Sequence, residues 1–342
     1  MISARLTRRA LLLGATLAAA WRVPPSLAEP VPLRVRLDWT PWGVHGAIHL
    51  AQAKGWLASA ALDVQVQDGN GSAATIQLIG SNTDFDVGHA SLATMMVGRS
   101  KGLPIKAIAI FMRQGDIGCF VPKGSGIRGP ADLKGKKLIY TPGSLEAPFI
   151  DTFLAAGGLR RMDVDLVAVS AASKVSAYAL GQADAAFSTI PFFLPAVAKA
   201  RPSDAIRFAD YALEMPGYGL ISQEAVLQSS KRQALAKYSS IIAATWRYIY
   251  DGHQDEAVDA IISQRPQARL DPSILRGQLD SLQDFLNTES SKMLPLGVME
   301  VKDWDIAVRN LIAVGLVDTK SRGSDFIEQG LVKPFSLPTT RQ

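Results

Sequence analysis

The sequence contains a single cysteine among 342 residues, Cys119, and this scarcity excludes several classes of protein. One thiol cannot build an internal disulfide framework or a multi-cysteine zinc or iron–sulfur site. Cys119 lies in the apolar segment Gly118-Cys119-Phe120-Val121. Such a segment is typical of a core strand, where an unpaired thiol packs as a small hydrophobic side chain.

The chain also has little net charge once its N-terminal segment is set aside. The formal charge of +5 includes Arg5, Arg8, Arg9 and Arg22, which lie in a segment that contains no Asp or Glu. Without these four arginines, 32 basic residues face 31 acidic ones. A near-neutral chain lacks the electrostatic surface of a nucleic-acid binder or a polybasic membrane binder, so we expect neither partner.

Long hydrophobic runs are missing as well, and the only prominent apolar run lies at the N-terminus. Arg5, Arg8 and Arg9 precede the apolar residues 10–20, and Ser26-Leu27-Ala28 has the small-x-small pattern of a cleavage site. We therefore expect residues 1–28 to be an export signal. Thr7-Arg8-Arg9 resembles a twin-arginine signal, and the choice between the general and the twin-arginine export route stays open. A plain N-terminal helix or a retained anchor is the alternative. The run is too short to span a bilayer, and the expected location is the periplasm.

Catalytic motifs are absent from the sequence. It contains no Gly-x-Ser-x-Gly elbow, Walker loop or His-Glu-x-x-His. His45 and His49 have the i, i+4 spacing of metal ligands without the accompanying glutamate. The run Gly69-x-Gly71-x-x-Ala74 superficially matches a dinucleotide fingerprint, but Asp84 and Asp86 stand at the start of the next strand instead of its end. We expect no catalytic residue, no metal and no cofactor.

What the sequence does contain is an alternation of short strands and helices that runs twice. The first round covers residues 33–111, and the pattern restarts at residue 118 with strands at 118–121, 137–140, 164–169 and 185–187. Strand–helix alternation predicts the α/β class, with parallel-rich sheets flanked by helices. Residues 215–221 are interpreted as a return strand, and everything after Ser222 as helical, with 233–250 the longest helix.

This organisation predicts two lobes with one inserted into the other. The first lobe would comprise residues 29–117 and 217–342, including the helical tail, and the second lobe residues 118–216. Two glycine-bearing crossing segments, near 116–118 and 213–217, are candidate hinges. Ligands of such folds usually lie between the lobes.

Several segments between residues 33 and 220 resemble the NMT1/THI5-like family. The similar segments, in order, are 37–41 (Leu-Asp-Trp-Thr-Pro), 50–57, 80–88, 102–106, 126–137 and 180–185. The resemblance implies the two-lobed fold of periplasmic binding proteins (type II). It also implies a monomeric solute-binding protein that delivers its ligand to an ABC permease in the inner membrane, with thiamine-precursor pyrimidines as the nearest ligand class. Sulfonates and nitrate are the alternative ligands.

A eukaryotic branch of the same family makes the thiamine pyrimidine with iron, pyridoxal phosphate and a cysteine-rich motif. One cysteine cannot form that motif, so a binding protein is favoured over a pyrimidine-synthesis enzyme on the same fold. A ligand-binding sensor domain is a third hypothesis, and no transmembrane or signalling segment follows the tail to favour it.

The candidate aromatic ligand-binding residues are Trp39, Phe192 and Tyr218. Trp39 follows a predicted strand, and the strand-end loops of α/β folds are where ligands bind. A planar heterocycle stacked on its indole would gain about 0.5–1.5 kcal/mol beyond area burial. Packing in the core is the alternative for all three, and Trp42 stays open between the two interpretations.

The candidate polar ligand-binding residues are His45, Ser72, Ser91, Ser144 and Glu146. The serines open predicted helices, where unsatisfied amide groups can hold a polar ligand edge, although plain helix capping is their commoner use. Pyrimidine-binding relatives carry a carboxylate beside an aromatic pair, whereas residues 188–193 here contain the aromatics without an acid. Glu146 is the candidate replacement, with a solvated glutamate as the alternative. The roles of His49 and His89 are left open.

Overall fold

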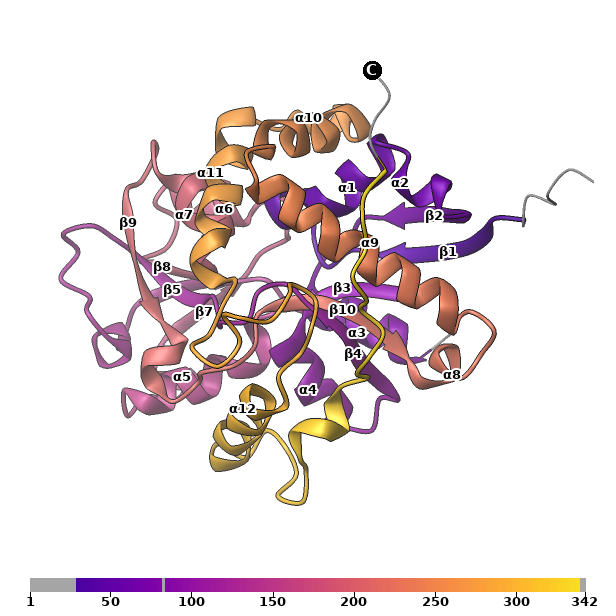
Figure 1. Cartoon of the computed structure of the whole chain (residues 1–342). Coiled ribbons are helices and arrows are strands. Elements are labelled where there is room, and N and C mark those ends of the chain that lie inside the picture. Colours follow the sequence, from indigo (N-terminus) through magenta and orange to yellow (C-terminus); the bar gives the residue numbers. More distant parts are fainter. Residues whose placement is uncertain (1–28, 82–83, 339–342) are drawn as a thin grey trace, which may run out of the picture.

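The structure is a computed structural model that describes residues 29–81 and 84–338 (Figure 1). The predicted signal segment 1–28 lies outside the described residues. The strands of the described part form two five-stranded sheets. The first sheet has the order β2-β1-β3-β10-β4, and its strands are Val31–Arg36 (β1), Leu62–Gln67 (β2), Val87–Ser91 (β3), Ile105–Ile110 (β4) and Tyr218–Gln223 (β10).

The second sheet has the order β7-β6-β8-β5-β9 and contains only residues between the two crossing segments. Its strands are Ile117–Pro122 (β5), Lys137–Tyr140 (β6), Asp165–Ala168 (β7), Ala185–Thr189 (β8) and Ser203–Arg207 (β9). We call the units built on the two sheets the first lobe and the second lobe. The exact boundaries proposed from the sequence stay a prediction.

Each sheet is mixed, with one strand running against the others. β1 pairs in parallel with β2 and β3, whereas β10 is antiparallel to both β3 and β4. In the second sheet β5 is the antiparallel strand, between β8 and β9. The two antiparallel strands, β5 and β10, are each the first strand that the chain forms after it crosses between the lobes. Such a strand starts at the interlobe boundary, where its parallel neighbours end, so it must run the opposite way.

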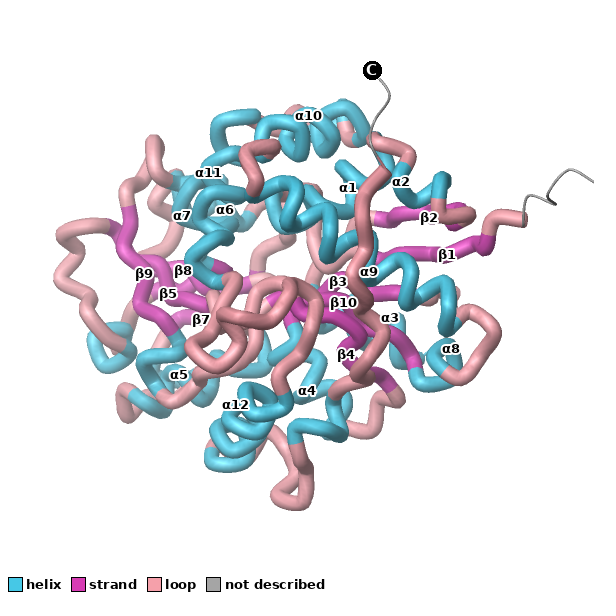
Figure 2. Tube along the Cα trace, in the orientation of Figure 1, coloured by secondary structure: helices cyan, strands magenta, loops and turns pink. Residues whose placement is uncertain are grey.

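Helices cover both faces of the first sheet and flank the second (Figures 1 and 2). Their bounds are Gly46–Ala53 (α1), Trp56–Ser59 (α2), Ser72–Ser81 (α3), Leu92–Ser100 (α4), Ile150–Ala156 (α5), Lys174–Ala179 (α6), Ile190–Val197 (α7), Glu224–Leu227 (α8), Arg232–Tyr250 (α9), Gln254–Gln264 (α10), Pro272–Leu282 (α11) and Val301–Ala313 (α12). The longest predicted helix is confirmed as α9. None of the helices in the described ranges has both the length and the apolar character that crossing a membrane requires.

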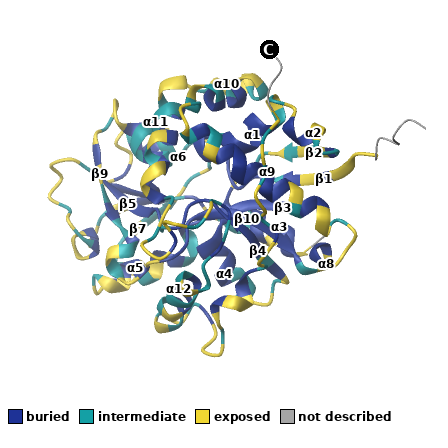
Figure 3. Ribbon diagram, viewed as in Figure 1, coloured by how far each residue is buried: buried dark blue, intermediate teal, exposed yellow. Residues whose placement is uncertain are grey.

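The core follows the central strands of the two sheets, which are dark in a view coloured by burial (Figure 3). Every residue of β3, β8 and β10 is buried, as expected for central strands with cover on both faces. Cys119 lies in β5 and is buried, which confirms the strand expected there. Burial raises the pKa of its thiol, so it packs as an unreactive apolar group.

The expectation that everything after Ser222 is helical is wrong. Residues 286–300 and 314–338 contain no α-helix, and they return to the first sheet through isolated bridges that pair Gly297 with Ile110 and Ile327 with Ala107. Part of the physical reason is local, because Pro295 and a left-handed Gly297 (φ 89°) interrupt a helix within residues 286–300. The remaining part is the set of contacts with distant residues, such as these bridges. The return strand also starts three residues later than predicted, at Tyr218.

Candidate ligand-binding site

The site lies where strands of both lobes end. Asp38 and Trp39 follow β1, while Ser91 ends β3 in the first lobe. In the second lobe Thr141 follows β6 and Thr189 ends β8. A pocket at this boundary takes its walls from both lobes and from the start of β10, and it is lined by Trp39, Trp42, Ser144, Leu145, Glu146, Lys174, Ser188, Thr189, Phe192 and Tyr218.

One wall of the pocket is aromatic. Phe192 meets Trp39 and Trp42 edge-on, with ring centroids 6.3 and 5.4 Å apart. Trp42 also meets Tyr218 edge-on at 5.7 Å. The indole Nε1 of Trp39 is buried and has no hydrogen-bond partner within residues 29–81 and 84–338. An unpaired buried N–H costs free energy, so this wall offers a donor that an acceptor on a ligand would satisfy.

The lining of the pocket also carries a buried ion pair. The Lys174 Nζ lies 2.6 Å from Glu146 Oε1 and donates to the carbonyl oxygen of Phe187 at 3.0 Å. Both charged side chains are almost fully buried. The ammonium also stands 5.1 Å from the centroid of the Trp39 ring. Glu146 Oε2 has no partner in the described part of the chain, so the ion pair offers a free acceptor while its two charges neutralise each other.

A polar network centred on Asp38 lies beneath the aromatic wall. Asp38 Oδ1 is 2.9 Å from His45 Nε2 and 3.3 Å from His89 Nδ1, and Ser72 Oγ donates to Asp38 Oδ2 at 3.3 Å. Burial alone would raise the pKa of Asp38, but the hydrogen bonds from the two histidines outweigh it and hold the pKa below its usual range. His89 stacks on Tyr218 at 5.4 Å, so the network supports the pocket from behind.

A second buried carboxyl, Asp116, lies in the first crossing segment. Thr189 Oγ1 donates to Asp116 Oδ2, and the backbone amide of Ile190 donates to the Asp116 carbonyl at 2.7 Å. Burial raises the pKa of Asp116 to about 7, against the lowering effect of the Thr189 hydrogen bond. Burial also raises the pKa of Tyr218 well above its ordinary value, so its hydroxyl stays protonated.

The structure brings five of the eight predicted site residues to the pocket wall and places three beneath it. Trp39, Ser144, Glu146, Phe192 and Tyr218 line the pocket. His45, Ser72 and Ser91 instead join the Asp38 network, and Ser91 also caps α4 by accepting the amide of Thr94 at 3.4 Å. These three residues therefore do not line the pocket, and each is buried and already hydrogen-bonded.

The structure also places the residues whose roles the sequence analysis left undecided. Trp42 lines the pocket, whereas His89 stands behind Tyr218. His49 faces away, with its Nδ1 at 2.8 Å from Gln264 Oε1, and burial lowers its pKa to about 4 against the opposing effect of that hydrogen bond. His49 is thus a neutral structural residue.

Sequence reasoning missed Lys174, Asp38, Asp116 and Thr189. A lysine is almost never fully buried unless it is paired, so nothing local in the sequence distinguishes Lys174 from a solvated helix residue. Asp38 belongs to the quoted Leu-Asp-Trp-Thr-Pro segment, and its position directly after a strand is a signal that could have identified it.

Asp38, His45 and His89 are the described group whose ligand atoms lie close enough to hold a metal ion, within 4.8 Å of one another. Both histidines already hydrogen-bond the same carboxylate oxygen, and His45 Nδ1 accepts the amide of Trp42 at 3.4 Å. A hydrogen-bonded network explains the arrangement without an ion.

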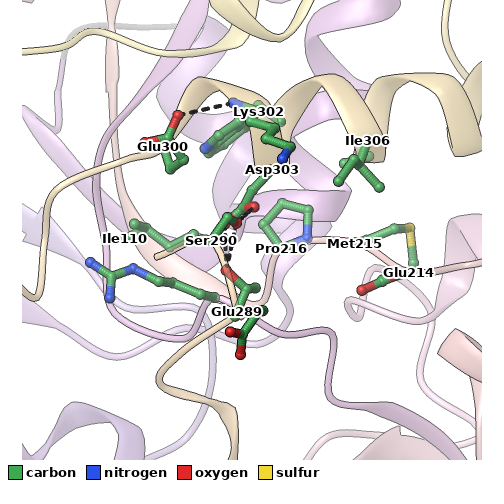
Figure 4. Close-up of a pocket in the computed structure, with 14 residues that line it drawn as sticks. Ile110, Glu214, Met215, Pro216, Glu289, Ser290, Glu300, Lys302, Asp303 and Ile306 are labelled. Carbon is green, nitrogen blue, oxygen red and sulfur yellow. Dashed lines mark hydrogen bonds between the residues drawn. The ribbon is translucent and has the colours of Figure 1, made fainter. Parts of the chain in front are cut away.

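A larger cavity, of about 330 Å³, lies between the two crossing segments and the start of α12 (Figure 4). Glu214, Met215 and Pro216 form one side, while Glu300, Lys302 and Asp303 form another. Its charges are of both signs. Arg113 is the buried cation of this lining. Its guanidinium already donates hydrogen bonds to oxygens of the 287–298 loop, including the Pro295 carbonyl at 2.6 Å. The lining therefore does not define the chemistry of a ligand.

The arrangement of two lobes built on mixed sheets is found in solved structures. The alkanesulfonate-binding protein SsuA from Xanthomonas axonopodis pv. citri, solved with bound MOPS, superimposes with a TM-score of 0.64 at 14% identity. The match covers 89% of this chain and 100% of that one. The fold is therefore that of periplasmic binding proteins.

The sequence comparisons give the family. The NMT1/THI5 like family profile matches residues 42–257, and the chain belongs to this family. The formylaminopyrimidine-binding protein of Halalkalibacterium halodurans is 26% identical over 285 residues, which cover 80% of this chain and 82% of that protein. The 4-amino-5-hydroxymethyl-2-methylpyrimidine phosphate synthase of Uromyces fabae is 32% identical over 109 residues, about a third (32%) of each chain.

Proposed function

We propose that this protein is the periplasmic solute-binding component of an ABC importer and that it binds a small planar heteroaromatic solute between its two lobes. The observation that carries the proposal is the lining of the pocket, which combines aromatic rings with the Glu146 Oε2, an oxygen without a partner among the described residues. Rings desolvate and orient a flat ligand, while few polar groups fix its edge. The ligand is bound and released unchanged.

The charge of the pocket favours a neutral solute with an N–H donor over an anion. Lys174 is the cation among the described lining residues, and Glu146 already neutralises it at 2.6 Å. A sulfonate or nitrate would have to displace that carboxylate or remain uncompensated in a buried site, which is costly. An aminopyrimidine instead donates to Glu146 Oε2 and accepts from Trp39 Nε1. The formylaminopyrimidine-binding relative supports this ligand class.

The experiment is a calorimetric comparison of formylaminopyrimidine and MOPS as ligands of the wild type and of Glu146→Gln. We expect the wild type to prefer the pyrimidine. Glu146→Gln removes a hydrogen bond to a charged group and should weaken pyrimidine binding at least about tenfold. It should also improve MOPS binding, because the positive charge of Lys174 is no longer neutralised by Glu146.

The matched control is Glu256→Gln, which breaks the half-exposed pair of Glu256 with Lys54 elsewhere in the first lobe. It should leave both affinities unchanged. A wild type that prefers MOPS would reject the neutral-solute proposal. Conversion of formylaminopyrimidine to another product, measured by mass spectrometry after incubation, would favour the rival enzyme.

A further inference from the structure

The two lobes touch through a pair of glycines at the edge of the pocket. Gly71, which precedes α3, lies so close to the second lobe that an added Cβ would stand 2.1 Å from the Gly143 carbonyl oxygen. The amide of Ala74, in the first turn of α3, donates to the same oxygen at 3.2 Å. The Gly-x-Gly run that resembles a dinucleotide fingerprint thus permits close backbone approach between lobes.

A side-chain hydrogen bond crosses the same boundary two residues further along the second-lobe loop. Thr94, buried at the start of α4, donates through its Oγ1 to the Leu145 carbonyl at 2.9 Å. Two helix starts of the first lobe therefore hold two carbonyl groups of a single loop, residues 143–145.

That loop leads directly into the pocket wall. Ser144, Leu145 and Glu146 all line the pocket, whereas Gly71 and Thr94 do not. With the loop held in this position, the pocket encloses only about 10 Å³, roughly the room of one water molecule. A ring-sized solute therefore needs the loop to move away from the first lobe on entry. The loop can return to its contacts with Thr94 and Ala74 only when side chains of the pocket wall give way to the solute.

We propose that Thr94 and the turn from Gly71 to Ala74 act as a latch. The Thr94 hydroxyl and the Ala74 amide hold the 143–145 loop against the first lobe, Gly71 leaves room for that approach, and the solute is retained without contact from these positioning residues. This inference rests on the proposed function. Because the latch acts after the solute has entered, its loss should raise the dissociation rate more than it lowers the association rate.

The first test is Thr94→Val, which removes the hydroxyl and keeps the shape of the side chain. Loss of one hydrogen bond predicts about two- to tenfold weaker binding of formylaminopyrimidine, chiefly through faster dissociation. The control is Thr75→Val, because Thr75 is equally buried and donates to the Leu37 carbonyl at 2.8 Å within the first lobe. Thr75→Val should lower stability and leave the dissociation rate unchanged.

The second test needs no ligand and measures the separation of the lobes. Spin labels at Asp63→Cys and Lys123→Cys, both exposed, report the distance between lobes, while the buried Cys119 stays unlabelled. Thr94→Val and Gly71→Ala should shift the distance distribution toward open forms. Gly102→Ala is the control, since its φ of +96° carries the same kind of backbone strain with no atom near the added Cβ.

The latch is overturned if Thr94→Val matches the wild type in both dissociation rate and lobe separation. A wild type that binds neither formylaminopyrimidine nor MOPS would reject the proposed function, and the ligand-free distances would still decide on the latch.

Discussion

Trp39 is a buried side chain whose ring is packed but whose N–H is unpaired. Phe192 and the Lys174 ammonium contact its ring, yet its Nε1 has no acceptor among the described residues. Trp56, in contrast, donates its indole N–H to the Pro338 carbonyl at 3.2 Å. The difference between these two tryptophans leads to a prediction at the scale of one residue.

Replacing Trp39 by phenylalanine removes the unpaired donor and keeps an aromatic ring. We expect Trp39→Phe to weaken formylaminopyrimidine binding by about two- to tenfold, the value of one hydrogen bond, with little loss of stability. Trp56→Phe should do the opposite, lowering the free energy of unfolding by about 1 kcal/mol without changing affinity. Calorimetry and urea unfolding of both variants check this. Equal affinities in Trp39→Phe and wild type would remove the indole N–H from the site.

Asp116 predicts a pH dependence of stability. Its pKa is raised to about 7 in the folded state, against a usual value of 3.8. The folded state therefore binds the proton more tightly than the unfolded state does. This stabilisation is fully present below about pH 4 and is lost as the pH rises to about 7, by up to about 4 kcal/mol.

Asp116→Asn should abolish that contribution. Urea unfolding at pH 5 and pH 8 should show a smaller decrease in the free energy of unfolding for Asp116→Asn than for the wild type. Identical decreases in both proteins would show that Asp116 does not titrate in this range.

At the residue scale, the sequence identifies side chains that follow strands or open helices. Trp39, Ser144 and Glu146 were predicted in this way and line the pocket. The burial of Glu146 was not expected, because its partner Lys174 is 28 positions away and only the tertiary fold brings them together. Whether these residues bind the solute stays a prediction for the experiments above.

At the scale of elements, Arg113 fastens the tail to the first crossing segment. Its guanidinium donates to Asn287 Oδ1 and to the backbone carbonyls of Ser291, Leu294, Pro295 and Val298. Apart from the bridge at Gly297, residues 287–298 belong to no helix or strand, so the planar fork of donors on Arg113 supplies much of their anchoring. The prediction concerns that segment.

Arg113→Lys keeps the charge but cannot reproduce the fork. We expect a loss of about 3 kcal/mol in the free energy of unfolding and faster hydrogen exchange confined to residues 287–298. Arg309→Lys, at an exposed position of α12, is the control and should change neither. Unchanged exchange in 287–298 would contradict the anchoring role.

Local sequence patterns are sufficient to predict some of the helices. Helices with capping residues or long amphipathic faces were placed within a few residues, as with α4 behind Ser91 and α9. The irregular tail was mistaken for helix, because its backbone is held by Arg113 and by bridges to β4, which lie more than 170 positions away in sequence. Local sequence carries no record of such contacts.

At the scale of the whole molecule, the two lobes and the order of their elements follow from the repeated strand–helix pattern and the family motifs. The direction of β5 and β10 does not, because alternation alone predicts parallel strands. Their reversal is a consequence of the chain crossing twice between lobes, a property of topology. The same double crossing joins the two lobes by two short segments. We refer to this two-lobed arrangement as a clamp.

The most direct test of the clamp is a calorimetric titration of the purified protein with formylaminopyrimidine, with the ligand recovered afterwards and weighed by mass spectrometry. We predict saturable binding of one molecule per chain and recovery of that molecule with its mass unchanged. Absence of binding, or recovery of a different compound, would contradict the central claim that this chain captures a flat solute and releases it intact.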